Sequence, residues 1–243
     1  MDCLFIHGNF PGQFRHLAPL LAEAGHRVVF LTNRTDIVKT EELGFEIRNY
    51  SLHRLPNEST HHYLTSLEEA VLQGQAVLRE INKLMAEGFT PRFVISHGGM
   101  GLGLFIKDLL PQTVHIGYFE WYFQPSTTKY LLEEFNLDEQ LRSGLRNLPI
   151  LQELEKCDVA IVPTEWQKEQ FPKPYRQKLQ VIFDGIDTNF FKKQSEGGRK
   201  IKKENSLKLR NRETDEIFTI PEKGIIVSYA TRGMETLRGF PEF

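Results

Sequence analysis

The feature that most constrains the fold is a regular alternation of short apolar runs with segments of helical spacing. Strand-like runs cover residues 3–7, 27–32, 45–49, 93–96, 114–119, 159–162 and 179–182. Strands separated by helices require crossover connections, and crossovers join parallel strands. The chain is therefore predicted to form an α/β fold, a Rossmann-like parallel sheet with helices on both faces.

The helical segments carry recognisable start and stop signals. Residues 11–24 place apolar side chains at the spacing of one helix face and end before Gly25. Residues 64–87 do the same over a longer stretch and end before Gly88. Residues 164–167 form a capping-box pattern, which predicts a short helix immediately after them.

Composition excludes several classes of protein. Hydrophobic residues make up 40% and charged residues 26%, as in ordinary soluble domains. The net charge of −2 gives no reason to expect a nucleic-acid partner. The two cysteines, Cys3 and Cys157, lie at the edges of apolar runs, which predicts buried free thiols in a reducing compartment and no disulfide or metal framework.

The sequence shows neither a secretory signal nor an apolar run near the ~18 residues that span a bilayer. A cytoplasmic location is expected, with peripheral contact to the inner membrane face left open. Residues 192–212 contain nine Lys or Arg against two Glu. This segment is predicted to be a solvated insertion or linker, and attraction to an anionic membrane is the alternative.

Ligands in parallel sheets bind beyond the carboxyl ends of the strands, so the loops that follow the apolar runs are the candidate sites. The first loop, residues 7–12, contains Gly8, Asn9 and Gly12. Its glycines allow close approach of a ligand, and a helix start would offer N–H groups to an anion or sugar hydroxyl. The loop lacks the G-x-G-x-x-G spacing of dinucleotide sites, and a plain strand-to-helix turn explains it equally well.

A second glycine-rich loop covers residues 96–103 and contains Gly98 and Gly99. It suggests a backbone-lined pocket in which His97 could act as a hydrogen-bonding or acid–base group. A structural histidine at the end of a strand is the alternative.

The third loop places Glu120 among the aromatic residues of the segment 118–123. Aromatic rings pack against sugar C–H surfaces, and a carboxylate accepts hydrogen bonds from sugar hydroxyls. In a dry pocket, Glu120 could also be tuned towards acid–base work. An aromatic cluster that covers the core, with a solvated or salt-bridged Glu120, is the alternative.

These segments together resemble glycosyltransferase family 4, whose members have the GT-B fold. The resemblance rests on the order of the motifs: the loop of residues 7–12, the strand region 158–165, and a turn at 184–187 with Asp184 in place of the usual Asn. Arg232 and Arg238 then resemble the family's G-R…K-G loop, with Arg in place of Lys. The first and last motifs resemble those of a bacterial subgroup.

The resemblance implies two Rossmann-like domains that face each other across a cleft. The first mainly binds a carbohydrate or lipid-linked acceptor, and the second binds a nucleotide sugar whose sugar is transferred with retention and without a metal or other cofactor. On this basis residues 1–191 form the acceptor-side domain, residues 192–222 a basic insertion, and residues 223–243 the first strand and helix start of an incomplete donor-binding domain.

The resemblance also assigns candidate residues. Arg232 and Arg238 would hold the donor diphosphate. Glu120 and His97 would line the cleft as catalytic candidates, although many members have a histidine near the place where this chain has Glu120. The acceptor or interdomain cleft would be lined by Gly8, Asn9, Gly12, Gly98, Gly99 and Asp187.

The family's paired-glutamate motif belongs to the second domain and does not occur in these 243 residues. The chain is therefore expected to be a truncated form, inactive by itself, that requires a donor domain in cis or in trans. Two alternatives stay open: a non-catalytic remnant or binding module, and another GT-B enzyme such as a nucleotide-sugar epimerase.

Overall fold

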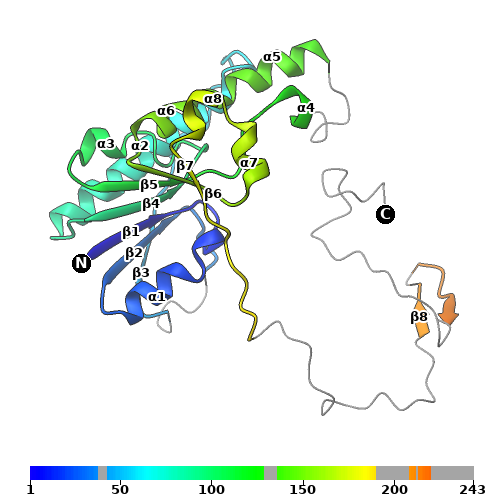
Figure 1. The fold of residues 1–243 in the computed structure, drawn as a ribbon, viewed down its shortest axis with the longest axis horizontal. Helices are drawn as coiled ribbons and strands as arrows, with labels where there is room; N and C mark the ends of the chain where they lie inside the picture. The colour runs from blue at the N-terminus through cyan, green and yellow to red at the C-terminus, as the bar shows by residue number, and fades with distance from the viewer. Residues whose placement is uncertain (38–42, 129–135, 190–207, 212, 220–243) are drawn as a thin grey trace. The chain divides into compact units, whose positions relative to one another are not determined.

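The computed structural model describes residues 1–37, 43–128, 136–189, 208–211 and 213–219. The chain divides into two compact units, Met1–Asp184 and Gly185–Phe243. The first unit holds a seven-stranded sheet with its helices (Figure 1). The second holds a small hairpin.

The sheet has the strand order β3-β2-β1-β4-β5-β6-β7, and every neighbouring pair is parallel. Its strands are β1 (Asp2–Ile6), β2 (Arg27–Thr32), β3 (Glu46–Asn49), β4 (Phe93–His97), β5 (Val114–Tyr118), β6 (Val159–Val162) and β7 (Leu179–Val181). All seven strand-like runs of the sequence are confirmed, and so is the Rossmann-like α/β fold.

The connections between these strands contain helices of very different length. They are η1 (Gly12–Phe14), α1 (Leu17–Glu23), α2 (Thr65–Ala86), α3 (Ile106–Leu109), α4 (Pro125–Thr128), α5 (Leu137–Leu145), α6 (Asn147–Lys156), α7 (Glu165–Gln170) and α8 (Lys173–Arg176). Among the described helices, none combines the length and apolar content needed to cross a bilayer. Thr164 caps α7 as predicted, because its side chain accepts a hydrogen bond from the Gln167 N–H at 3.2 Å.

The prediction of one continuous helix over residues 11–24 is wrong. The chain forms a single 3-10 turn at Gly12–Phe14, and α1 begins only at Leu17. Pro19 explains the late start, because a proline is tolerated in the first turn of a helix but breaks the hydrogen-bond ladder in the interior.

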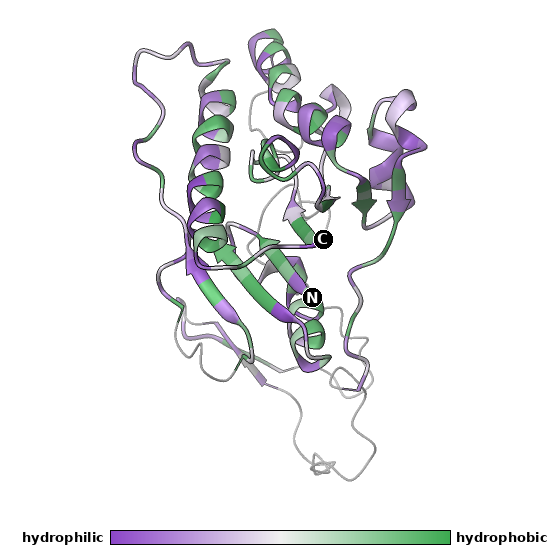
Figure 2. Cartoon of the chain, turned by 90° about the vertical axis from the view of Figure 1, so that its left-hand side faces the viewer, coloured by the Kyte–Doolittle hydropathy of each residue, from purple (hydrophilic) through white to green (hydrophobic). Residues whose placement is uncertain are grey.

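Alternate side chains of the same strand are buried on opposite faces of the sheet. In β1, Leu4 and Ile6 pack with α2 and α3, whereas Cys3 and Phe5 pack on the opposite side with residues of η1 and α1. Figure 2 shows the consequence: the strands are largely hydrophobic, whereas the helices are banded with polar and apolar residues. A sheet covered on both faces can bind ligands only at its edges or ends.

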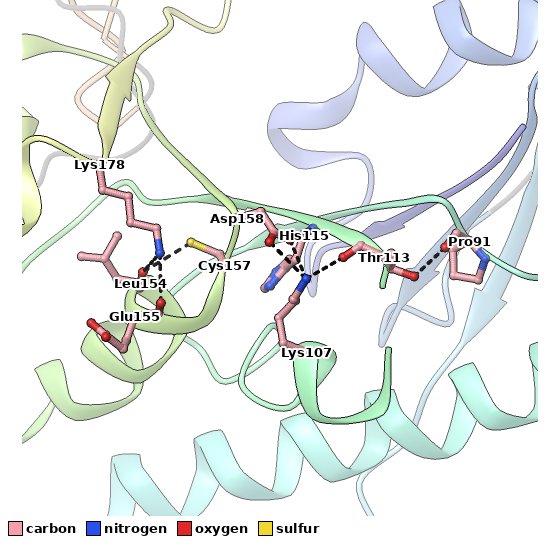
Figure 3. A network of polar contacts seen from close by, with 9 residues as sticks. All are labelled: Pro91, Lys107, Thr113, His115, Leu154, Glu155, Cys157, Asp158 and Lys178. Carbon is pink, nitrogen blue, oxygen red and sulfur yellow. Dashed lines mark hydrogen bonds and ion pairs between the residues drawn. The ribbon is translucent and has the colours of Figure 1, made fainter. Parts of the chain in front are cut away.

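A polar network fastens β5 to β6 near their amino ends (Figure 3). The Asp158 carboxylate accepts hydrogen bonds from Lys107 Nζ and from the backbone N–H of His115, both at 2.8 Å. Lys107 Nζ also donates to the Thr113 carbonyl at 2.9 Å. Burial lowers the pKa of His115 to about 4, so this histidine is a neutral, structural residue at physiological pH.

The two cysteines are free thiols in the core, as predicted. Cys3 and Cys157 are both buried, and burial raises the pKa of Cys157 to about 11. A thiol with so high a pKa is a poor nucleophile and metal ligand.

The second unit contains a two-stranded antiparallel hairpin, β8 (Lys208–Arg210) and β9 (Ile217–Thr219). The carboxylate of Asp215 pairs with the Arg210 guanidinium across the turn. The basic segment 192–212 therefore ends in a strand in its described part. The predicted strand at residues 224–230 lies outside the described residues, as do Arg232 and Arg238.

Candidate functional site

The candidate site lies where the strand order of the sheet reverses. The chain leaves β1 towards β2 on one side, and it leaves β4 towards β5 on the other, so the loops diverge between these two neighbours. His7 follows β1 directly and His97 is the last residue of β4, with their ring centroids 4.4 Å apart. Two histidines thus meet at the point where α/β sheets bind ligands.

A chain of hydrogen bonds links these histidines through Glu120, which follows β5. The Nε2 atom of His97 lies 2.9 Å from Glu120 Oε2, and Gln13 Nε2 donates to Glu120 Oε1 at 2.7 Å. The Oε1 atom of Gln13 lies 2.6 Å from His7 Nε2. The backbone N–H of Asn9 donates to His7 Nδ1 at 2.8 Å, so the proton of neutral His7 is on Nε2 and points to Gln13.

Burial and hydrogen bonding determine which of these side chains are charged at neutral pH. Burial, helped by the nearby charge of His97, lowers the pKa of His7 to about 4. The hydrogen bond from His97 lowers the pKa of Glu120 below its usual value, although burial alone would raise it. At neutral pH His7 is neutral and Glu120 is ionised. The carboxylate is thus an acceptor of hydrogen bonds and a weak base, and its tuning towards acid–base work stays a prediction.

Within this hydrogen-bond network, the more exposed side chain of Glu120 is accessible to a ligand. Its side chain is 37% exposed, against 12% for His97, whose Nδ1 is buried without a partner among the described residues. Gln167 Nε2 donates to the Glu120 carbonyl at 3.0 Å and fixes the backbone. The side chain of Gln167 thus supports the site through Nε2, while its Oε1 atom accepts a hydrogen bond from Thr164 Oγ1 at 2.7 Å.

The first glycine-rich loop shapes the pocket around His7. Gly12 has a φ of +52°, and a Cβ there would lie 2.5 Å from His7 Nε2, so only glycine fits beside the imidazole. The Gly8 carbonyl accepts a hydrogen bond from Thr32 Oγ1 at 3.0 Å. The Asn9 side chain accepts one from Arg34 at 3.3 Å.

The second glycine-rich loop folds over a buried carboxyl group. The N–H of Gly99 donates to Glu153 Oε2 at 3.1 Å, and the Glu153 side chain is fully buried. Burial raises the pKa of Glu153 to about 8, against the opposing effect of the backbone N–H groups of Gly99, Gly101 and Gly103. A Cβ on Gly98 would lie 2.6 Å from the Phe119 ring, so this glycine serves close packing.

The remaining predicted residues fall elsewhere. Asp187 belongs to the second unit, where its carboxylate accepts a hydrogen bond from the Asn189 N–H at 2.9 Å. Asp184, at the end of the first unit, accepts a hydrogen bond from the hydroxyl of Tyr118 in β5. Among the described residues no group of three or more His, Cys, Asp or Glu side chains could hold a metal ion.

Sequence reasoning missed three members of the site, His7, Gln13 and Gln167. The signal for His7 was available, because it ends the first strand-like run and His97 directly follows the fourth. Gln13 and Gln167 carried no such signal, since each reaches Glu120 from a segment distant in sequence, 107 and 47 residues away.

We expect His7 to stay neutral until the pH falls to about 4, with its proton on Nε2, because burial disfavours the imidazolium. Nitrogen-detected NMR titration of the ring gives both the pKa and the tautomer. Replacing His97 by Gln should raise the pKa of His7, since a neighbouring positive charge is removed. A His7 that titrates above pH 6 would contradict the arrangement.

Comparison with known families now adds to this geometry. The sequence matches the profile of the Glycosyl transferase family 4 group over residues 24–191. The chain belongs to this family. The comparison with curated proteins finds no match.

Solved structures that this chain resembles include several glycosyltransferases. A sucrose-phosphate synthase structure from Thermosynechococcus elongatus is 14% identical, with a TM-score of 0.50 over 78% of this chain and 91% of that one. Anabaena HepE, solved with UDP and glucose, is 12% identical, with a TM-score of 0.49 over 79% of this chain and 46% of that one. The starch synthase IV catalytic domain of Arabidopsis thaliana, bound to ADP and acarbose, is 11% identical, with a TM-score of 0.48 over 77% and 52%. The chain thus spans about half the length of the last two proteins.

Proposed function

We propose that this family 4 chain is the acceptor-side half of a retaining glycosyltransferase, which moves a hexosyl group from a nucleotide sugar to a carbohydrate or lipid-linked acceptor. The observation that carries the proposal is the ionised, half-exposed Glu120 at the switch point of the sheet. Membership of the family supports the reaction class. A cytoplasmic protein with peripheral membrane contact is part of the same proposal.

In this proposal Glu120 accepts a hydrogen bond from the acceptor hydroxyl and orients its oxygen towards the donor. The chain His7–Gln13–Glu120–His97 holds the carboxylate in one rotamer, so that little entropy is lost when the acceptor binds. The bond between the anomeric carbon and the diphosphate breaks, and a bond from that carbon to the acceptor oxygen forms.

The hydroxyl proton also needs a destination. A phosphate oxygen with a pKa of about 6 is a stronger base than Glu120, whose pKa lies below its usual value. We therefore assign the final proton to the departing diphosphate, and to Glu120 the role of stabilising positive charge that develops at the sugar.

The donor half of the reaction would use Arg232 and Arg238, which resemble the family's diphosphate-binding pair. Two guanidinium groups suit the charge and geometry of a diphosphate without a metal. Because further donor contacts would come from a second domain, residues 1–243 alone are proposed to be inactive.

We expect Glu120→Gln to reduce transfer on the order of 100-fold in the protein made from the complete reading frame of the gene, because the variant amide cannot carry the negative charge. Release of nucleoside diphosphate from a panel of nucleotide sugars, with and without candidate acceptors, is the measurement. Glu165→Gln, which alters an exposed carboxylate on α7, is the matched control and should leave the rate unchanged.

The outcomes separate the rival functions. Diphosphate release that depends on an acceptor supports a transferase, whereas conversion of the nucleotide sugar without any acceptor indicates an epimerase. A complete protein that binds saccharide but never turns over would establish a binding module and overturn the proposal.

A further inference from the structure

A second feature of the first unit is a pocket of about 270 Å³ beside the Glu120 site. It lies between α2, the loop after β4 and the start of α6, with Glu69, Gln73, Gly99, Phe123 and Arg146 in its lining. Gly99 is two residues after His97, and Phe123 is three residues after Glu120, so the pocket and the candidate site share two loops. Its volume is just below the range of ~300–1,000 Å³ for drug-sized ligands and suits one ring-sized group.

Arg146 is the unusual member of this lining. Its guanidinium carbon lies 4.4 Å from the centroid of the Phe123 ring, yet within the described part of the chain no carboxylate pairs with it. Burial, together with the neighbouring charge of Arg142, lowers the pKa of Arg146, whereas the negative charges of Glu139 and Glu69 act in the opposite direction. Arg142 itself pairs with Glu139 at 2.7 Å. A partly desolvated guanidinium that forms no ion pair is a binding group for carboxylate or phosphate.

The wall that supports Arg146 is rigid. The buried side chain of Asn147 exchanges two hydrogen bonds with the Phe123 backbone, at 2.8 Å to its N–H and 2.9 Å to its carbonyl. The Phe123 backbone is therefore held in place beside Arg146, and a guanidinium that already lies over the aromatic ring loses little freedom when a ligand binds.

The α2 side of the pocket has the opposite chemistry. Glu69 contributes a carboxylate to the lining, and Gln73 is only 7% exposed with an Oε1 atom that has no partner among the described residues. These oxygens accept hydrogen bonds but donate none, so they suit hydroxyl groups. A bare anion would be repelled by Glu69, and a neutral sugar would leave Arg146 unpaired.

We propose that this pocket binds one sugar ring that carries a carboxylate or phosphate group, with the anion on Arg146 and ring hydroxyls on Glu69. The assignment of this ring to the acceptor rests on the proposed function, but the binding itself does not. The specificity would then be for an acidic saccharide.

Binding can be measured on residues 1–243 without a donor, by calorimetry or by amide chemical shifts, with four probes: glucuronate, glucose 6-phosphate, glucose and inorganic phosphate. We expect at least one acidic sugar to bind at least 10-fold more tightly than glucose or phosphate. Arg146→Gln should abolish this preference, and Arg146→Lys should retain part of it. Arg92→Gln, an exposed arginine at the opposite end of β4, is the control and should change nothing.

A second variant, at Glu69, keeps the proposal testable if Arg146→Gln does not fold. Glu69→Ala removes both a like charge and an acceptor for hydroxyl groups, so it should tighten binding of inorganic phosphate and reduce the preference for the acidic sugars over phosphate. Equal affinities for glucose and the acidic sugars, phosphate binding as tightly as any sugar, or no binding at all would each overturn the inference. None of these binding results tests acceptor-dependent transfer at Glu120, so either proposal can be wrong while the other holds.

Discussion

Replacing Glu153 by Gln is expected to remove a pH-dependent change in the free energy of unfolding on the order of 4–5 kcal/mol. This change arises because burial raises the pKa of the Glu153 carboxyl group from 4.5 to about 8. Between these two pH values the folded chain keeps a proton that the unfolded chain has released. The contribution of Glu153 to stability is therefore greatest below pH 4.5, falls as the pH rises, and is lowest above pH 8. The glutamine variant is neutral at every pH and should lack this contribution to the slope.

Urea denaturation of both proteins at intervals between pH 5 and pH 8.5 measures the effect. Glu155→Gln is the matched control, because Glu155 lies on the same helix and is exposed. Near pH 5 the Glu153→Gln variant should be about as stable as the wild type. Both the protonated carboxyl group and the amide are then neutral, and each can accept the hydrogen bond from the Gly99 N–H. Parallel stability curves for the wild type and this variant would contradict a buried, protonated Glu153.

The same residue shows where sequence reasoning stops. Strand positions were predictable because each strand-like run of the sequence matches one strand of the sheet, and alternation with helices along the chain implies parallel pairing. Glu153 looked like one more charged residue of an amphipathic helix. Its burial depends on the loop of Gly99, which α6 meets only in the folded sheet.

The candidate site was predictable by position more than by role. The rule that ligands bind beyond carboxyl ends of strands located His97 and Glu120, which the structure joins by a hydrogen bond of 2.9 Å. The direction of the Glu120 pKa did not follow from sequence, because it depends on a histidine from a neighbouring strand. The glycines of residues 98–103 suggested a backbone-lined pocket, and Gly99 does line one. A Cβ on Gly98, Gly101 or Gly103 would instead clash with neighbouring side chains or backbone, which the sequence did not indicate.

Gly101→Ala is expected to destabilise the first unit by about 4 kcal/mol or more, or to prevent its folding. A Cβ at this position would lie 2.0 Å from the Ala70 carbonyl oxygen, which is backbone of α2 and cannot rotate away. Either α2 or the glycine-rich loop has to shift, and both pack against the same core cluster, through Val77 and Leu102. A loss of this size is exceptional for a single methyl group and is diagnostic of a steric clash with the backbone.

Gly88→Ala separates this clash from backbone strain. Gly88 and Gly101 have nearly the same φ, +84° and +85°, but a Cβ on Gly88 meets nothing within 4 Å. Strain alone should cost about 1–2 kcal/mol in both variants. The difference between the two free energies of unfolding, measured in urea, therefore reports the contact between the loop and α2. Because Gly99 lines the pocket of Arg146, a large difference would also mean that the packing of α2 sets the position of this wall, whereas equal losses would leave the loop free to move independently of the helix.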